Sequence, residues 1–422
     1  MRKILQKILR ILAEIALKKY KPVVIAITGS VGKTSTKEAI YSVLKSHFGE
    51  KRVRRNYRNY NNELGVPLTI FDLETGGKSI LRWIPKFIKM LWMILFRVEY
   101  PDFLILEMGA DKPGDIKYLL DFVHHEVGVI TAVGEIPVHV EFFETPEKVA
   151  EEKETLTKML DKEGIAVLNY DDERVRAMAE KISAKALTYG LNDKADVRAT
   201  NCDLKIIDKG ENISELNFKL DFKGSSVPAK LTNVLGCQHL YSALAAVAVG
   251  IIFDMNLVEI SEALKQIEAI PGRMRLLRGI KNTLIIDDSY NAALLSMEAG
   301  LDALRSFPDP PTGEAGRRKI AVLGDMLEIG RYSPEAHTRV GKKAAEIADV
   351  IFAVGNCAGF VVEGAMSVGF DSNKIFQFPS SEQAKLAVQK ELKENDIILV
   401  KGSRSMQMEK VIEEIVQQGA IV

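Results

Sequence analysis

Cysteine is scarce in this sequence. Cys202, Cys237 and Cys357 are the only three among 422 residues, and none of them belongs to a CxxC pair. Neither a disulfide framework nor a thiolate metal site is indicated, and a reducing cytoplasm suits such a chain best. Net charge is missing too, because 57 Lys and Arg balance 57 Asp and Glu. No global field favours nucleic acid as a partner, so electrostatic recognition has to be local.

An apolar run long and uncharged enough to span a bilayer of about 30 Å is also lacking. Two segments come near. Residues 1–21 carry Ile and Leu at helical spacing among seven basic residues, and residues 80–96 (ILRWIPKFIKMLWMILF) are apolar but interrupted by charges. Two interpretations stay open: each helix packs an apolar face on the protein body, or basic and aromatic residues attach it to the inner face of a membrane.

Short β-branched runs alternate with helix-prone stretches over the first two thirds of the chain, which predicts an α/β fold with a doubly wound parallel sheet. Between 196 and 231 the pattern becomes strictly alternating (ELNFKLDF), which indicates an antiparallel addition. The predicted strands are 22–28, 103–106, 128–131 and 165–168, and the predicted helices are 146–160 and 243–252.

Residues 269–275 (AIPGRMR) hold Pro and Gly between helical and strand-like segments, which predicts a hinge between domains. A second alternation follows and predicts a Rossmann-like α/β domain, with a surface loop at 308–316. Its predicted strands are 283–287, 319–323, 350–354 and 397–400, and its helices 295–304 and 334–348. We therefore expect an amphipathic N-terminal helix, a central domain with an apolar insertion, and a C-terminal domain: 1–21, 22–270 (insertion 80–96) and 271–422.

A glycine loop lies between the first predicted strand and the helix after it. In such a loop, backbone N–H groups turn towards an anion, while a lysine and a threonine reach the terminal phosphates and a magnesium ion. The residues expected to hold the phosphates of ATP are Gly29, Ser30, Val31, Gly32, Lys33, Thr34 and Ser35. Ile27 replaces the first glycine of the general motif, so only its second half is met.

The loop sequence TGSVGKTSTK resembles the variant loop of the Mur ligases and of folylpolyglutamate synthetase. Further blocks resemble the MurF type of Mur ligase in the same order along the chain. They are NYNNELGVPL from Asn59, LEMGA from Leu106 with PGDI from Pro113, VHVEFF from Val138, PGRM from Pro271, DDSYNA from Asp287, LGDMLE from Leu323 and VKGSR from Val400.

The resemblance implies an ATP-dependent ligase that converts a peptide carboxylate into an acyl phosphate and joins it to an amine. Attack brings anionic groups together, so magnesium and cationic side chains have to neutralise them. It implies that Thr34 and Glu107 hold one magnesium ion, and that Glu107 and His139 serve a second. Lys153 falls where several Mur ligases carry a carbamylated lysine, which would also be an oxygen ligand. The implied catalytic residues are Lys33, Glu107, His139, Lys153 and Arg273.

The resemblance also implies which residues bind the nucleotide and the substrates. Asn169, Asp172, Asp288 and Arg273 would contact the nucleotide, and Gln238 and His239 stand where the family has His-Asn near the base. The implied substrate residues are Asn61, Asn62, Tyr290, Asn291, Asp325, Lys401, Ser403 and Arg404. Several of these could instead cap helices or shape turns.

Two departures from the MurF pattern bear on the substrates, the first on the acceptor and the second on the amine. Only about twenty residues precede the first predicted strand, where MurF proteins have a domain that grips uridine diphosphate. Either the basic run Lys51, Arg52, Arg54, Arg55 and Arg58 holds the nucleotide sugar, or the acceptor differs. Ala293-Leu294 also replaces a common Asn-Pro.

Three functions therefore remain. The leading one adds D-alanyl-D-alanine to a muramoyl-tripeptide acceptor. The second is a related ligase for a lipid-linked, pseudomurein or polyglutamate-like acceptor, and the third is an ATP-binding scaffold that ligates nothing. The expected partners are a nucleotide-linked or lipid-linked peptide and an amino acid or dipeptide amine.

Overall fold

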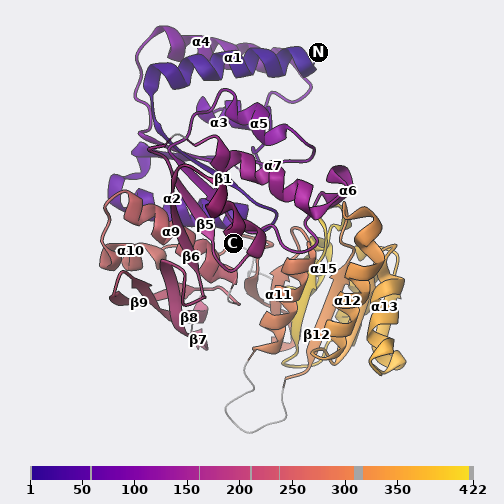
Figure 1. Cartoon of the computed structure of the whole chain (residues 1–422). Coiled ribbons are helices and arrows are strands. Elements are labelled where there is room, and N and C mark those ends of the chain that lie inside the picture. The colour runs from indigo at the N-terminus through magenta and orange to yellow at the C-terminus, as the bar shows by residue number, and fades with distance from the viewer. Residues whose placement is uncertain are drawn as a thin grey trace.

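The computed structural model describes residues 2–57, 59–160, 162–209, 212–236, 238–307 and 317–417. Arg58, Cys237 and the proline-rich loop 308–316 lie outside the described residues. Two β-sheets with their covering helices form two bodies, and a cleft separates them. Figure 1 shows the first body at the upper left and the second at the lower right.

The first sheet has the strand order β2-β3-β1-β4-β5-β6-β7-β8-β9. Strands β2 to β7 pair in parallel, and β8 and β9 extend the sheet as an antiparallel meander. The strands are β1 (Val23–Thr28), β2 (Val53–Arg55), β3 (Phe103–Glu107), β4 (Val127–Ile130), β5 (Ile165–Asn169), β6 (Lys185–Gly190), β7 (Val197–Lys209), β8 (Asn212–Phe222) and β9 (Ser225–Thr232).

Both faces of this sheet are covered, which explains why its strands are continuous apolar runs. Along β1, Val24 and Ala26 pack into one core cluster while Ile25 and Ile27 pack into the other, as the period of two in a strand requires. One face is covered by α2 (Lys33–Phe48), α9 (Gln238–Ile252) and α10 (Leu257–Leu264). On the other side lie α3 (Gly65–Ile70), α5 (Asp115–Leu120), α6 (Val140–Phe143), α7 (Pro146–Lys158) and α8 (Glu173–Arg176).

Helices α1 (Arg2–Tyr20) and α4 (Ile80–Leu95) form an outer layer beyond α3 and α5 (Figure 1). Each contributes one side to the core, through Leu9, Ala13 and Ala16 of α1 and through Trp83, Met90 and Met93 of α4. Among the described helices, none combines the length and the apolarity that crossing a membrane requires.

The second sheet has the order β10-β11-β15-β12-β13-β14, and only the edge strand β10 pairs antiparallel. The strands are β10 (Arg275–Arg278), β11 (Leu284–Asp288), β12 (Lys319–Gly324), β13 (Val350–Val354), β14 (Ile375–Phe378) and β15 (Ile397–Lys401). One face is covered by α11 (Leu294–Arg305), α12 (Ser333–Ala345) and α13 (Ala358–Ser367), and the other by α14 (Ser381–Glu391) and α15 (Glu409–Ile415). The predicted fold class, a parallel central sheet followed by a Rossmann-like α/β unit, is confirmed.

Candidate active site

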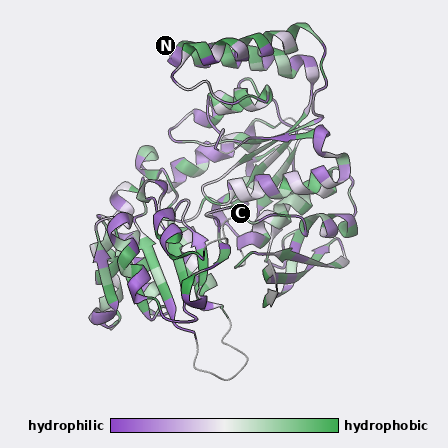
Figure 2. Ribbon diagram, turned by 180° about the vertical axis from the view of Figure 1, so that it is seen from behind, coloured by the Kyte–Doolittle hydropathy of each residue, from purple (hydrophilic) through white to green (hydrophobic). Residues whose placement is uncertain are grey.

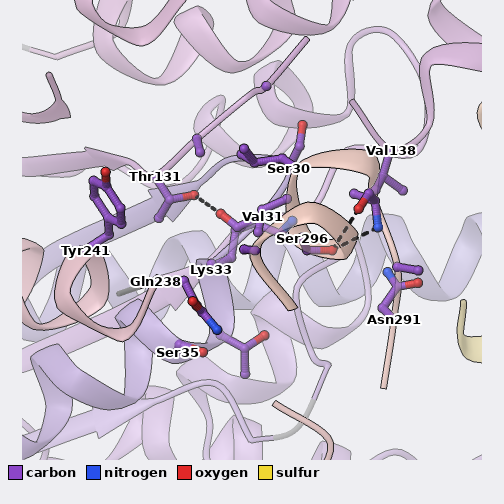
Figure 3. Close-up of a pocket in the computed structure, with 18 of the residues that line it drawn as sticks. Ser30, Val31, Lys33, Ser35, Thr131, Val138, Gln238, Tyr241, Asn291 and Ser296 are labelled. Carbon is purple, nitrogen blue, oxygen red and sulfur yellow. Dashed lines mark hydrogen bonds between the residues drawn. The ribbon is translucent and has the colours of Figure 1, made fainter. Parts of the chain in front are cut away.

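The cleft between the two sheets has a volume of about 1390 Å³ and is lined by residues of both bodies. Its walls follow the carboxyl ends of strands β1, β3, β4, β5, β11 and β15, the edge at which open parallel sheets bind ligands. Figure 3 shows Val31, Lys33 and Thr131 of the central domain in the same pocket as Asn291 and Ser296 of the C-terminal domain.

The loop after β1 has the geometry of an anion site. Gly29 has φ +148°, and a Cβ there would meet Thr131 Oγ1 at 1.9 Å, so only glycine fits. Gly32, at φ +88°, leads into α2, whose first turn leaves its N–H groups without intrahelical acceptors. Lys33 Nζ donates a 2.6 Å hydrogen bond to Gly29 O and closes the loop. The N–H groups of Ser30 and Val31 bond to Ala132 O, so the helix N-terminus and the Lys33 ammonium are the groups that this loop offers to an anion.

Glu107, at the end of β3, is 2% exposed and has neutral donors on both carboxylate oxygens. Thr34 Oγ1 donates to Oε2 at 3.1 Å and Asn61 Nδ2 donates to Oε1 at 3.0 Å. Lys37 Nζ lies 3.8 Å from Oε2. A buried carboxylate beside a threonine hydroxyl is an all-oxygen donor set of the kind that magnesium prefers.

The Lys33 ammonium interacts electrostatically with charged groups on both walls of the cleft. Its pKa lies below the usual lysine range because burial, helped by Arg273, outweighs the attraction of Glu107. An anion in the loop would remove that imbalance. Lys33 is therefore poised for a negatively charged ligand.

His139 joins the two bodies. It begins α6 with φ +69°, and its Nδ1 lies 2.7 Å from Oε2 of Glu328, which follows β12 in the C-terminal domain. Its Nε2 lies 3.7 Å from Asp111 Oδ1. Interaction with the close His139 side chain lowers the pKa of the Glu328 carboxyl. Two carboxylates and the imidazole thus meet where α6 borders the cleft.

Lys153 lies inside α7 and is 2% exposed. Burial lowers its pKa to about 7, with repulsion from Lys33 adding to the effect. Its neighbour Glu152 accepts hydrogen bonds from the N–H groups of Gly114 and Ile116, both at 2.8 Å. Lys153 is not a lining residue of the cleft but is close enough to Lys33 for their charges to interact.

Asn169 and Asp172 line the cleft but already serve the backbone. Asn169 Oδ1 accepts from the Asp171 N–H at 3.0 Å. Asp172 Oδ1 caps α8, and its Oδ2 accepts 2.8 Å hydrogen bonds from the N–H groups of Val133 and Gly134. Asp172 therefore holds the loop after β4 in place.

Gln238 and His239 begin α9 and also line the cleft. Gln238 Nε2 donates to Leu235 O at 3.2 Å. Burial lowers the pKa of His239 to about 4, so its imidazole is neutral at physiological pH. A neutral imidazole has one donor and one acceptor, which suits contact with an uncharged base.

On the opposite wall, Lys401 Nζ forms a buried ion pair with Asp288 Oδ2 at 2.6 Å and donates to Asn291 O at 2.9 Å. Burial lowers the pKa of Lys401 and raises that of Asp288, while their mutual attraction opposes both shifts. Ser403 Oγ accepts from the Leu327 N–H at 2.9 Å. This wall is organised before any ligand arrives.

Two guanidinium groups lie over the ring of Tyr290. The Arg273 Cζ is 4.3 Å and the Arg404 Cζ 5.5 Å from the centroid of its ring. Asn59 Nδ2, from the central domain, donates to the Tyr290 hydroxyl. Tyr290 is thus a contact between the bodies as well as a cleft residue.

Two predicted substrate residues, Asn62 and Asp325, are not among the residues that line the cleft. Asn62 Oδ1 accepts from the N–H groups of Leu64 and Gly65, and so holds the turn into α3. Both oxygens of Asp325 accept from the N–H groups of Asn356 and Cys357, at 2.8 and 3.0 Å, and hold the loop after β13. Their polar groups are used by the backbone.

Asp325, His337 and Cys357 gather within 4.8 Å in the described part of the chain. His337 Nε2 accepts from the Met326 N–H at 2.9 Å, and Nδ1 donates to Ser333 O at 2.7 Å. With both ring nitrogens and both carboxylate oxygens engaged, this cluster stabilises loops.

The basic run after α2 is engaged locally. Arg52 pairs with Asp102, Arg54 donates to Ile70 O at 2.7 Å, and Arg55 lies 2.5 Å from Glu38. Arg58 lies outside the described residues. These partners account for the three arginines without a nucleotide sugar.

Sequence reasoning missed several residues of the site. Asn56 accepts from the Glu107 N–H, Lys37 borders that carboxylate, and Asp111 and Glu328 flank His139. Asn59, Asp111 and Glu328 each stand in or next to a block that had been recognised, so their position was the available signal. For Thr131, whose hydroxyl fills the space that a Cβ on Gly29 would need, the sequence held no such signal.

A phosphate loop facing a cationic wall across an interdomain cleft defines an ATP-dependent enzyme of two α/β domains. Residues 27–82 and 84–250 match the model of the Mur ligase middle domain, and residues 272–404 match that of the Mur ligase glutamate ligase domain. The chain belongs to the Mur ligase family and is an ATP-dependent, ADP-forming amide ligase.

Its similarity to individual proteins extends over nearly the whole chain. It is 30% identical to the UDP-N-acetylmuramoyl-tripeptide--D-alanyl-D-alanine ligase of Synechocystis sp. over 94% of this chain and 75% of that protein. MurF from Acinetobacter baumannii superposes with a TM-score of 0.78 at 25% identity, covering 97% of this chain and 80% of the other. MurF from Thermotoga maritima in complex with ADP gives 0.76 at 25% identity, covering 97% and 83%.

Proposed function

We propose that this ligase adds D-alanyl-D-alanine to a UDP-linked muramoyl-tripeptide in peptidoglycan precursor synthesis. The observation that carries the proposal is the single cleft, in which the phosphate loop and Glu107 face Arg273, Lys401 and Arg404. One substrate must be activated by ATP and the other must reach the same carbon, so both walls have to serve one reaction. ATP and these precursors are cytoplasmic substrates, and the proposal puts the enzyme there.

In the proposed reaction the peptide carboxylate attacks the γ-phosphate and becomes an acyl phosphate, with ADP as the leaving group. Lys33 and the amides of the first turn of α2 stabilise the phosphate oxygens, and Arg273 approaches from the other domain. The dipeptide amine then attacks the acyl carbon, and phosphate leaves. Tyr290 and Asn291 lie on the wall from which the amine would come.

Mg²⁺ fits the oxygen donors of Thr34 and Glu107, and when bound it would neutralise the phosphates. For a second ion, Glu107 and His139 are the proposed ligands together with Lys153. An ammonium cannot coordinate a metal, so Lys153 fits only as a carbamate, formed when its neutral amine adds CO₂ and releases a proton. A pKa of about 7 keeps much of that amine neutral under physiological conditions.

The carbamate has its own test. Protein equilibrated with ¹³C-bicarbonate should give a carbamate carbonyl signal by NMR that is missing from the Lys153→Met variant. The same spectrum from both proteins would remove Lys153 from the proposed site.

Phosphate release from ATP tests the activity. The purified protein with Mg²⁺ is given UDP-N-acetylmuramoyl-tripeptide, D-alanyl-D-alanine or both, and the product is weighed by mass spectrometry. Release only with both, and the mass of the pentapeptide product, are expected. Release with a lipid-linked or polyglutamate acceptor but not with the UDP-linked one would favour the second candidate.

A further inference from the structure

The outer sides of α1 and α4 form an apolar surface that the core does not use. Among the described residues, twelve of the twenty large hydrophobic side chains that are exposed belong to α1, α4 and the C-cap residue Phe96. In Figure 2, hydrophobic residues run along both helices at the top of the molecule, although only one side of each packs on the domain. We call this surface the outer helical face.

On α1 the exposed apolar residues form one stripe. Ile4, Ile8, Ile11 and Ile15 are between 41% and 66% exposed and recur at helical spacing. The stripe is separate from the core side, which is formed by Leu9, Ala13 and Ala16. Packing against the body therefore explains one side of the helix and leaves the isoleucine stripe unexplained.

Helix α4 also has a core side and an exposed apolar stripe, and its stripe is larger. The exposed stripe is 48% to 78% exposed and consists of Ile80, Leu81, Ile84, Ile88, Leu91 and Leu95. Trp92 continues it and lies 4.1 Å from Phe96 between ring centroids. Amphipathic aromatic rings at the border of an apolar stripe are typical of helices that lie in the interface of a bilayer.

The two helices are fastened to each other. Lys19 Nζ donates to the carbonyl oxygens of Met93 and Ile94, each at 3.0 Å, and the Tyr20 hydroxyl donates to Met93 O at 2.6 Å. They therefore present their stripes as one layer, at the end of the central domain away from the C-terminal domain (Figure 1). A surface bound there leaves the cleft open.

Charge decides what the face binds. The chain as a whole is neutral, yet α1 and α4 together hold nine basic residues and one acidic residue, Glu14, which lies 2.7 Å from Lys18. Arg2 and Arg10 pair with Glu63 and Asp121 of the body. Lys3, Lys7 and Arg82 are exposed cations without a carboxylate partner among the described residues. A second copy of this face would bring like charges together, which is unfavourable. An anionic lipid surface complements the charge and accepts the apolar stripes.

We propose that the outer helical face docks this ligase on the surface of a membrane that contains anionic lipid. The apolar stripes of α1 and α4 would enter the boundary between head groups and acyl chains, and the flanking lysines and arginines would contact the lipid phosphates. The helices lie on the membrane and do not cross it. The proposal concerns location and is independent of which acceptor the cleft uses.

Flotation with the full chain tests the proposal. Vesicles of phosphatidylcholine alone, and of phosphatidylcholine with phosphatidylglycerol, are centrifuged with the protein at low and high salt. We expect binding to the mixed vesicles that weakens with salt, and little to the neutral ones. Absence of binding to the mixed vesicles, or equal binding to both kinds, overturns the proposal.

Matched variants locate the binding surface. Replacing Leu81, Ile84, Ile88 and Leu95 by Ser should lower the bound fraction about tenfold or more, because each is exposed and its loss spares the core. The control replaces four residues of similar exposure elsewhere by Ser, namely Val258, Met366, Val368 and Leu386. Equal binding by the two variants would refute the assignment. Phosphate release should be unchanged in both, which separates a docking defect from a folding or catalytic one.

Charge reversal gives the second arm. Lys3→Glu, Lys7→Glu and Arg82→Glu in one chain keep the apolar stripes and should abolish the preference for anionic vesicles. Light scattering of the wild type and the serine variant tests the other possible occupant, a second copy of this chain. A concentration-dependent dimer that the serine substitutions dissolve would identify the face as a protein interface and overturn the lipid proposal.

Discussion

The two walls of the cleft carry charge in different ways. On the central wall, Glu107 is held by the neutral donors Thr34 and Asn61, and Lys33 bonds to a carbonyl. On the C-terminal wall, the charges of Asp288 and Lys401 already neutralise each other at 2.6 Å. Lys33 on the central wall is thus bonded to a neutral carbonyl, whereas Lys401 on the opposite wall is already paired with a carboxylate.

This difference separates two kinds of contribution. Residues of the central wall should contribute chiefly to turnover, because their partners arrive with ATP. The Asp288–Lys401 pair of the C-terminal wall should contribute to stability and shape, because each charge has its partner built in. Substitutions can break this division or make it sharper.

The largest effect should follow removal of Lys401. The Lys401→Met substitution leaves Asp288 buried without its partner, and we expect a loss of about 3–5 kcal/mol in the free energy of unfolding. Denaturant unfolding measures it. The matched control is Lys343→Met, which breaks a 2.6 Å pair with Asp302 at the surface and should cost less than about 1 kcal/mol.

A double variant tests the cause of that loss. Lys401→Met with Asp288→Asn removes both charges and should recover part of the stability, because no ion is left unpaired. Equal costs for Lys401→Met and Lys343→Met would show that the C-terminal wall does not depend on its ion pair.

Removal of Lys33 should have the opposite result: a large loss of turnover and a small change in the free energy of unfolding. Lys33→Ala is expected to lower kcat by about 100- to 1000-fold, since a positioned donor to a transferring phosphoryl group is lost. Unfolding should change little, because within the described part of the chain the Lys33 ammonium bonds to the Gly29 carbonyl and to no carboxylate. Lys45→Ala on the exposed side of the same helix is the control for helix α2. A large stability loss without a turnover loss would place Lys33 among the structural residues.

How far sequence predicts this site depends on how local each interaction is. The strands and the loop at residues 29–35 could be predicted because apolar period and glycine placement act within a few residues. The divided roles of carboxylates could not. Asp325 and Glu107 both follow or end a buried strand. Backbone N–H groups bind the Asp325 carboxylate, whereas the side chains of Thr34, Asn61 and Lys37 surround that of Glu107.

Contacts between domains were the hardest to predict from the sequence. The meeting of His139 with Glu328 and the two guanidiniums on Tyr290 join residues that are far apart in the chain. Two short strands were missed as well: the edge strand β14 (IFQF) and the strand β6 (KALTYG), which lies between β5 and β7. Each has too few residues to show a period. The roles of the site residues and the domain limits at 21 and 270 remain predictions.

Lys153, behind the central wall, should make the stability of the protein depend on pH. Its folded pKa of about 7 lies below the usual 10.5, so between these values the unfolded chain binds more protons, and this group makes stability rise with pH. Below pH 7 the full free-energy cost of burying the charged Lys153 side chain is present. Lys153→Met should therefore stabilise the protein by roughly 2 kcal/mol at pH 6 relative to pH 10, because water penetration relieves part of the full shift.

Thermal unfolding at pH 6 and pH 10 in buffer free of CO₂ measures the difference. The control is Lys148→Met, an exposed lysine on the same helix that pairs with Glu144. If the stability gain from Lys153→Met is the same at both pH values, then Lys153 does not titrate in this range and its burial is compensated by other groups.

The smallest effect should come from Tyr290, where the two walls touch. Tyr290→Phe keeps the ring against Arg273 and Arg404 and loses only the hydrogen bond from Asn59, so we expect the KM for D-alanyl-D-alanine to rise less than about threefold. Tyr290→Ala releases both guanidiniums and should raise it about tenfold, since each cation–π contact is worth roughly 0.5–1 kcal/mol. Steady-state kinetics at saturating ATP separates them. Equal effects of the two substitutions would mean that the hydroxyl, and hence the contact between domains, matters more than the arginine stack.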